Sequence, residues 1–405
     1  MKPLLSLITT CCVVGVNADG IAADRFVQDR FVIGFWVDPP LDDQADERYR
    51  EIAEAGFSLV IGFQARTEEA ADHQLRLCRK YGLDVLLPMV TPDPTGLPDS
   101  PPCRGYLVRD EPNARDFPAL REQVDAIRAA RPGKLAYINL FPNYASKEQL
   151  GTETYEEHVA RFVAEVQPDV LSMDHYPIFK PGADGRAAYC ANLEVMRAHS
   201  LDAGIPFWNF FNTMPYGPHT DPTEAQLRWQ VHATLCYGGK GVLYFCYYTP
   251  GGGEFPKGGA IIARDGRKTR HYEQARRINR VVRNLGSTLM RLTSTGVFRV
   301  KPGDEPAAVL AGTPVRSLGR VDYDPEHDLL IGAFRHADGR RAVMIMNYHF
   351  AYTAWPTVEF DAEIDAVREV DPATGEECAV TDDSPDLDGL QISLDAGEGR
   401  LFLLP

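Results

Sequence analysis

Residues 105–141 read GYLVRDEPNARDFPALREQVDAIRAARPGKLAYINLF and contain one complete unit of a repeating pattern. The opening run GYLV predicts a short strand. Leu120, Val124 and Ile127 then recur at the 3.6-residue period of an amphipathic helix. Gly133 marks the end of this helix, because glycine adopts the left-handed conformation that closes helices. The final run KLAYINLF predicts a second strand, so the segment is typical of two parallel strands joined by a helix.

This unit repeats along the chain and predicts an α/β fold, a (β/α)8 TIM barrel spanning residues 25–293. Its strands are continuous apolar runs, as expected for parallel strands that are covered on both faces. An open, doubly wound sheet is the alternative, but no glycine-rich phosphate loop follows the first strand. The predicted strands are 31–37, 57–63, 83–89, 105–108, 134–141, 169–175, 206–211 and 241–247.

One unit lacks its helix. The stretch between Met89 and Gly105 is rich in proline and shows no helical period, so a loop is expected there. After the barrel, residues 294–405 contain short strand-like runs separated by Gly, Asp and Pro, which predicts a C-terminal antiparallel β-sandwich. Trp355 is its one tryptophan, so a sugar-binding role for this domain is the less favoured interpretation.

The N-terminus indicates the compartment. A positive start at Lys2, a mostly apolar run over 4–16 and small residues up to Ala18 predict a signal peptide over 1–18. The alternative is an N-terminal strand that is not removed. We therefore expect a secreted or periplasmic protein, and no later segment is long enough to span a membrane. The remaining six cysteines form no C-x-x-C pair, so we expect no structural zinc site. Cys78, Cys190 and Cys236 lie in helical patterns and are interpreted as buried free thiols, while a disulfide elsewhere stays open.

The motif Arg109-Asp110-Glu111-Pro112 follows the fourth predicted strand, where barrel enzymes place reactive side chains. Two adjacent acids repel each other, which raises the pKa of one and makes it a proton donor. The alternative is that these acids cap the next helix, with Pro112 and Asp116 at its start. The position in the barrel favours the catalytic interpretation.

This motif resembles the Asn-Glu-Pro signature of the clan A glycoside hydrolases, with Asp110 in place of the asparagine. The barrel followed by a β-domain is also similar to the family 42 β-galactosidases and their relatives with an Asp-Glu-Pro motif. The resemblance implies that Glu111 is the general acid/base. It also implies a nucleophilic glutamate on the seventh strand, and this chain departs from the family there.

The sixth and seventh strands supply further candidates. The sixth ends in Asp174-His175-Tyr176, and we predict Asp174 as the second catalytic carboxylate, with His175 and Tyr176 contacting substrate. The seventh strand contains no acidic residue. An inverting mechanism and a nucleophile at an unusual position are therefore both kept as alternatives. Other predicted substrate contacts at strand ends and in the loops that follow are Trp36, Asp38, Asp110, Asn139, Trp208, Asn209, Asn212, Tyr247 and Glu254.

These residues predict hydrolysis of an O-glycosidic bond in an oligosaccharide or polysaccharide. The alternatives are a sugar-binding barrel without catalysis, and transglycosylation by the same residues. The net charge of −15 argues against a nucleic-acid partner. The chain contains no H-E-x-x-H motif, P-loop or nucleophile elbow, so we expect no metal and no cofactor.

Overall fold

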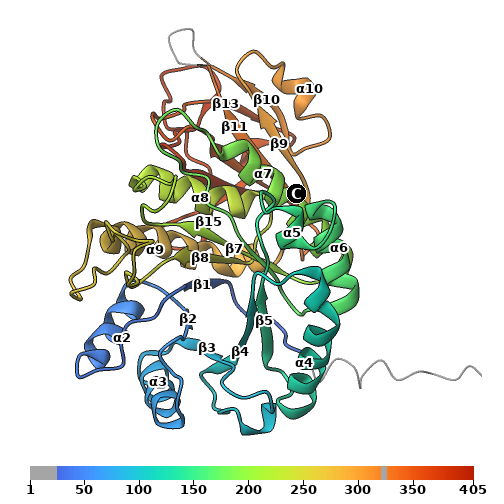
Figure 1. Ribbon diagram of the computed structural model, residues 1–405. Coiled ribbons are helices and arrows are strands. Elements are labelled where there is room, and N and C mark those ends of the chain that lie inside the picture. Colours follow the sequence, from blue (N-terminus) through green and yellow to red (C-terminus); the bar gives the residue numbers. More distant parts are fainter. Residues whose placement is uncertain (1–24, 321–325) are drawn as a thin grey trace, which may run out of the picture.

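The computed structural model describes residues 25–320 and 326–405; the predicted signal peptide over 1–18 lies outside them. Its central element is an eight-stranded parallel sheet with helices between the strands (Figure 1). The strands are β1 (Val32–Phe35), β2 (Leu59–Ile61), β3 (Asp84–Pro88), β4 (Cys103–Asp110), β5 (Leu135–Asn139), β6 (Leu171–Asp174), β7 (Phe207–Asn212) and β8 (Gly241–Phe245).

The sheet closes on itself. Strand β1 pairs in parallel with β8 over four residues, and β5 meets β6 through a parallel bridge between Leu140 and Met173. There the Leu140 amide donates to the Ser172 carbonyl at 2.8 Å. An open sheet has no such contact between its outer strands, so the TIM-barrel prediction is confirmed and the doubly wound alternative is excluded.

Helices form the outer layer of the barrel. Gly82 and Gly204 have positive φ directly after α3 and α7, as the sequence predicts for helix ends. Between β3 and β4 the chain forms a short 3-10 helix, η1 (Pro94–Gly96), which confirms the expected loop. The other helices are α2 (Ala45–Glu54), α3 (Glu68–Tyr81), η2 (Ala114–Asp116), α4 (Phe117–Ala130), α5 (Lys147–Leu150), α6 (Tyr155–Val166), α7 (Arg186–Ala203), α8 (Glu224–Cys236) and α9 (Arg270–Met290).

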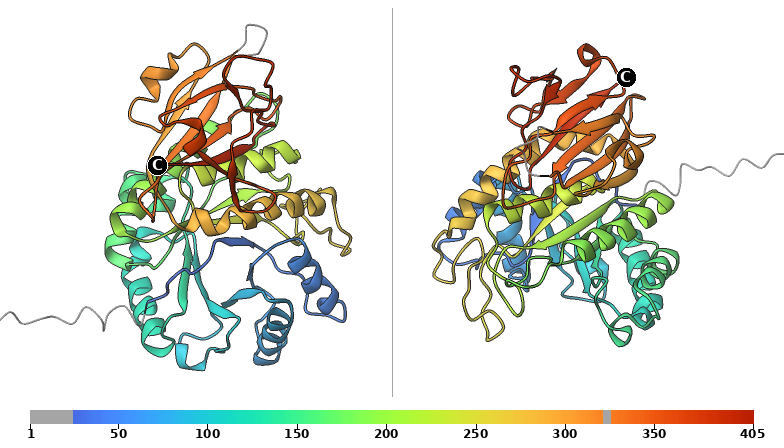
Figure 2. Two further views of the ribbon diagram at one scale, coloured as in Figure 1. Left: turned by 180° about the vertical axis from the view of Figure 1, so that it is seen from behind. Right: turned by 90° about the horizontal axis from the view of Figure 1, so that it is seen from above.

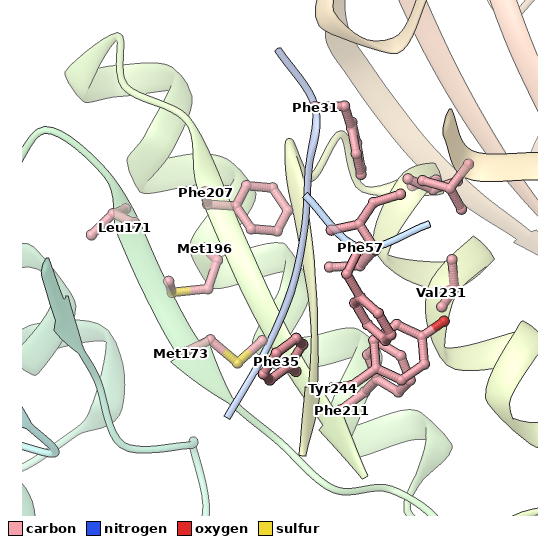
Figure 3. Packing of buried hydrophobic residues seen from close by; sticks show 14 of the residues in the cluster. Phe31, Phe35, Phe57, Leu171, Met173, Met196, Phe207, Phe211, Val231 and Tyr244 are labelled. Atoms are coloured by element: carbon pink, nitrogen blue, oxygen red, sulfur yellow. The ribbon is translucent and has the colours of Figure 1, made fainter. Parts of the chain in front are cut away.

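Large apolar side chains fill the space between the strands and this helix layer (Figure 3). Phe57 lies edge-on to Phe35 and to Tyr244, with ring centroids 5.1 and 5.2 Å apart. Phe211 packs on the other side of Tyr244 at 4.4 Å. Because these rings come from three different strands and a loop, their packing fixes the strands relative to one another.

The C-terminal domain is a β-sandwich, also as predicted. A six-stranded sheet has the order β15-β14-β17-β12-β11-β9, and a three-stranded sheet has the order β10-β13-β16. The predicted boundary at 294 falls inside its first strand. The elements are β9 (Leu292–Val300), α10 (Pro306–Val309), β10 (Val315–Gly319), β11 (Leu329–His336), β12 (Arg341–Asn347), β13 (Thr357–Phe360), η3 (Ile364–Ala366), β14 (Arg368–Val370), β15 (Glu377–Ala379), β16 (Leu390–Gln391) and β17 (Gly399–Leu404).

The two domains share helix α8, which packs on β7 of the barrel and on β11 and β12 of the sandwich. Figures 1 and 2 show the sandwich, in orange and red, stacked on the side of the barrel that carries this helix. Trp229 is fully buried and contacts Tyr189 on one side and Tyr348 on the other. A Cβ at Gly332 would lie 2.4 Å from the Cys236 carbonyl, so β11 approaches α8 as closely as glycine permits.

Two further predictions from the sequence concern membrane-spanning segments and the cysteines. Over 25–320 and 326–405, no helix combines the length and apolar character needed to cross a bilayer. The six cysteines outside the N-terminal segment are unpaired thiols, which agrees with the interpretation of Cys78, Cys190 and Cys236 as free thiols.

Candidate active site

A pocket of about 470 Å³ opens at the carboxyl ends of the barrel strands. This end of a TIM barrel carries the active site in barrel enzymes, and the volume suits a small ligand. Seven of the predicted site residues line the pocket together with six other residues. The lining consists of Trp36, Val37, Asp110, Glu111, Asn139, Asp174, Tyr176, Phe210, Tyr216, Phe245, Pro250, Glu254 and Phe255.

Asp110 and Glu111 are free for the pocket because another residue caps the next helix. The Asn113 side chain accepts from the Arg115 amide, and Asp116 accepts from the Asn113 amide, which forms a capping box. The structure therefore excludes the interpretation of Asp110 and Glu111 as helix caps. Glu111 is anchored through its own amide, which donates to the Asn139 carbonyl at 2.8 Å.

The backbone at Glu111 is strained. Its φ is +46°, and Val37, which follows β1 and also lines the pocket, has a φ of +62°. Gln167 is the third non-glycine residue with positive φ in the described part of the chain, and it lies outside the pocket. Such conformations cost about 1–3 kcal/mol each and concentrate at functional sites. Both strained pocket residues follow barrel strands at the point where their side chains turn into the pocket.

Glu111 and Asp174 both line the pocket and lie close enough for each to affect the pKa of the other. Burial raises the pKa of Glu111 to about 7, and the charge of Asp110 adds to this effect. Burial also raises the pKa of Asp174 well above its usual range, with further contributions from Glu111 and Asp110. Two neighbouring carboxyl groups, of which Asp174 is buried and Glu111 half-buried, resist being ionised together, so one of them keeps a proton near neutral pH. The pair can therefore act as a proton donor.

Asn139 holds this acid group together. Its Nδ2 donates to Asp174 Oδ1 at 2.9 Å and to Asp110 Oδ1 at 3.2 Å. Its own Oδ1 accepts from Ser172 Oγ at 3.0 Å, and Ser172 contacts the Tyr137 hydroxyl at 2.7 Å. Because each link is buried or half-buried, the chain fixes the side-chain amide in one orientation. Asn139 therefore positions both carboxylates from strand β5.

Aromatic rings form the other walls. Tyr176 lies 5.1 Å from Phe245 and 5.7 Å from Tyr216, measured between ring centroids. Tyr216 also packs on Phe255 at 5.5 Å, and Trp36 stands on a different wall, edge-on to Phe210 at 5.5 Å. Aromatic faces beside carboxyl groups suit a sugar, whose C–H groups stack on rings while its hydroxyls bind polar atoms.

Two predicted contacts lie behind the pocket wall. Asp38 is fully buried and accepts from the Phe63 amide and from Gln74 Nε2, both at 2.7 Å. Burial raises the pKa of Asp38 to about 7 despite these hydrogen bonds. Tyr247 is stacked on Phe35 at 4.5 Å among the apolar side chains. Both side chains face the helix layer, so neither reaches the cavity.

Two predicted contacts on the seventh strand also lie outside the pocket. Asn209 points outward, and its Nδ2 donates to Tyr189 at 2.6 Å and to Thr234 at 3.0 Å. Trp208 points into the barrel near its opposite end, where its Nε1 donates to Gln28 at 2.9 Å. Neither side chain contacts the pocket, because the first faces the helices and the second lies too early in the strand.

Asn212 and His175 are placed at strand ends but are fully covered. Asn212 pairs in register with Phe245, a pocket residue, and its side-chain oxygen and nitrogen find no hydrogen-bond partner among the described residues. His175 binds Asn192 through Nδ1 at 3.0 Å, and burial lowers its pKa to about 4. Its ring supports Tyr144, which lies edge-on at 5.0 Å. Neither residue lines the cavity.

Six lining residues were not predicted from the sequence. Phe210 and Phe245 are apolar residues inside strands, and nothing in the sequence separates them from core residues. Tyr216, Pro250 and Phe255 come from loops, where periodicity gives no information about direction. For Pro250 and Phe255 the sequence did contain an indication, because the run Gly251-Gly252-Gly253 marks a loop at the end of β8. The sixth residue is Val37.

A larger cavity of about 630 Å³ lies at the opposite end of the barrel, beside the start of β7 and the half-buried Lys240. Its acid, Asp169, is paired with Arg25 at 2.6 Å and with Arg128 at 2.8 Å. This end of TIM barrels serves stability rather than catalysis. Over 25–320 and 326–405, no group of three or more His, Cys, Asp and Glu side chains is arranged to hold a metal ion.

Several solved structures have a fold similar to that of this chain. A β-galactosidase from Bacillus circulans sp. alkalophilus superposes with a TM-score of 0.60 at 12% identity, over 93% of this chain and 99% of that chain. A catalytic mutant of a family 42 β-galactosidase from G. stearothermophilus gives 0.59 at 10% identity, over 94% and 100%. The fold resembles that of the family 42 β-galactosidases. At this level of identity the likeness concerns the fold alone.

A third solved structure is matched over a shorter region. The β-galactosidase from the haloarchaeon Halorubrum lacusprofundi superposes with a TM-score of 0.50 at 14% identity, over 67% of this chain. This chain spans 60% of that protein's length. No protein-family model matches the sequence, and no curated protein matches it.

Proposed function

We propose that this protein hydrolyses O-glycosidic bonds of a glycan outside the cytoplasm, with Glu111 as the general acid. The observation that carries the proposal is that Glu111 and Asp174 line one aromatic-walled pocket at the carboxyl end of the barrel, where Asn139 binds Asp174. A carboxyl group that stays protonated near neutral pH can give its proton to the leaving glycosidic oxygen. The fold supports the same reaction class, since the similar solved structures are glycosidases.

The pocket also indicates which glycans to test first. Its lining includes four acidic residues and, among the described residues, no Arg, Lys or His. A carboxylate or sulfate on the sugar in this pocket would meet like charges without a cationic partner, which costs free energy. We therefore expect neutral sugars in the position that contacts Glu111.

The test is a digestion screen of neutral oligosaccharides, polysaccharides and aryl glycosides with the purified protein. We expect new reducing ends from at least one substrate, measured by a reducing-sugar assay and product chromatography. The Glu111→Gln variant serves as the matched control. Glycan binding without cleavage, equal in the wild type and in this variant, would instead establish the sugar-binding alternative that the missing acid on β7 keeps open.

The pKa of Glu111 predicts the pH dependence of the reaction. A general acid works in its protonated form, which predominates below a pKa of about 7 and is lost as the pH rises above it. We expect kcat/KM to fall by about tenfold per pH unit on the alkaline side of this value. The measurement is a pH profile on a substrate with a poor leaving group. Activity that keeps rising beyond pH 8 would contradict this assignment of the acid.

A further inference from the structure

Two exposed aromatic side chains lie beside one cavity on the β-sandwich. In the described part of the chain, the exposed aromatic residues are Tyr144 on the barrel and Tyr352 and Trp355 in the loop between β12 and β13. The exposed fractions of Tyr352 and Trp355 are 41% and 39%. Both side chains line the same small cavity of about 60 Å³. A single exposed ring is ordinary, whereas exposed rings grouped around one hollow mark a binding surface.

The loop that carries the two rings has a fixed shape. Asn347 is buried, and its Nδ2 donates to the Tyr352 carbonyl at 2.8 Å while its Oδ1 accepts from the His349 amide at 3.0 Å. The His349 ring stacks on the Tyr352 ring, with the ring centroids 4.3 Å apart. Ala354, directly before Trp355, exchanges two backbone hydrogen bonds of 2.9 Å with the loop that precedes β17. Because the backbone is held on both sides of each ring, binding a ligand there requires little further ordering.

Polar groups surround the two rings. The same cavity is lined by Glu326 and Thr353, both exposed. Within the described residues, neither side chain forms a hydrogen bond or an ion pair, so their oxygen atoms are available to another molecule. A sugar places its C–H groups on aromatic faces and its hydroxyls on such oxygen atoms. The cavity has room for a hydroxyl group, so the sugar ring itself would lie across the exposed rings.

This surface lies at the end of the molecule that carries the pocket with Glu111. Helix α7 begins at Arg186, whose guanidinium donates to the Tyr348 carbonyl at 3.2 Å and lies over the Phe350 ring at 4.8 Å. Arg228, near the start of α8, donates to the Ala396 carbonyl at 2.7 Å. Barrel helices begin at the carboxyl ends of the strands they follow. Both contacts therefore place the β12–β13 loop, and the loop before β17, on the pocket side of the barrel.

From this arrangement we propose that Trp355 and Tyr352 form a second sugar-binding site, which holds a segment of the polysaccharide that is cleaved in the pocket. The inference rests on the proposed function and specifies its substrate as a polymer. The sequence showed Trp355 as an isolated tryptophan, which disfavoured a sugar-binding role for this domain. The structure adds Tyr352 on the same cavity and the polar side chains beside both rings.

Affinity electrophoresis tests the binding separately from catalysis. Full-length proteins that carry Glu111→Gln are run in native gels with soluble galactan, mannan or β-glucan, with and without Trp355→Ala. Binding in the pocket is common to both proteins, so a difference in retardation reports on Trp355. We expect at least one polysaccharide to retard the protein with Trp355 at least twofold more. Equal retardation in every gel, zero included, would overturn the proposal.

Two further variants control this comparison, and thermal melting verifies the folding of each. Trp355→Phe keeps an aromatic face and should retain most of the retardation. Ile364→Ala removes another exposed apolar side chain of the same domain, outside the cavity, and should be retarded like the protein without it. Loss of retardation in Ile364→Ala as well would overturn the assignment to Trp355. None of these substitutions changes the charge, so mobility without polysaccharide is the same.

Hydrolysis by the protein with Glu111 intact shows whether the site serves the reaction. We expect Trp355→Ala to raise KM for the polysaccharide by about three- to tenfold, because one stacking contact is lost. Hydrolysis of a small aryl glycoside should be unchanged, because this substrate occupies the pocket alone. An unchanged KM for the polysaccharide, or an equal loss on both substrates, would overturn the proposal. If no glycan is cleaved while the electrophoretic difference is present, the proposed function fails and sugar binding at Trp355 stands.

Discussion

Replacing Glu111 with glutamine is expected to lower kcat by about 10²- to 10⁴-fold on a glycoside whose leaving oxygen has to be protonated. Glutamine has nearly the same shape as glutamate, and its amide can still donate to Asp174. The fold should therefore persist while the transferable proton is lost. The measurement is steady-state hydrolysis of a substrate identified in the digestion screen. The control variant is Glu122→Gln, an exposed position on α4 outside the pocket lining.

The leaving group gives a second test of the same residue. A dinitrophenolate departs without a proton, so its glycoside should lose much less activity in Glu111→Gln than an alkyl glycoside does. An equal loss on both substrates would indicate that Glu111 contributes to binding or folding rather than to proton transfer. Unchanged turnover on both would remove Glu111 from the mechanism.

Truncation of Trp229 to alanine is expected to reduce the free energy of unfolding by about 3–5 kcal/mol. The side chain is fully buried in helix α8, between Tyr189 of the barrel and Tyr348 of the β-sandwich. Its removal leaves a cavity at the contact between the two domains, which the surrounding rings cannot fill without moving. The measurement is urea denaturation followed by circular dichroism.

Trp229→Phe is the matched control. The indole Nε1 has no hydrogen-bond partner among the described residues, so phenylalanine loses no hydrogen bond and keeps most of the apolar contacts. We expect it to retain most of the stability that alanine loses. If both variants unfold at the wild-type urea concentration, the packing on α8 does not hold the two domains together.

The order of the elements was accessible from the sequence because it depends on local physical chemistry. Apolar runs, the helical period of residues such as Leu120 and Val124, and glycines after helices each act over a few residues. The proline-rich stretch after Met89 indicated a missing helix by the same logic. The position of Glu111 followed as well, since the end of the fourth strand of a barrel is fixed once the strands are counted.

The direction of each side chain was not accessible in this way. Barrel strands are apolar on both faces, so their composition does not show which residues point inward. The neighbours Asn209 and Phe210 illustrate this: the first binds Tyr189 on a helix, and the second lines the pocket. Asp38 likewise looked like a substrate contact, but it turns away from the cavity and accepts hydrogen bonds from Phe63 and Gln74.

The sequence by itself determined a TIM barrel with a β-sandwich and an acid pair at the end of the fourth strand, because these follow from local periodicity and chain order. The tertiary structure alone decided that Glu111, Asp174 and Glu254 line one pocket, and that Asn139 binds both Asp174 and Asp110. These relations join residues 29 to 143 positions apart in the chain. Closure of the sheet sets such distances, and no local pattern encodes them.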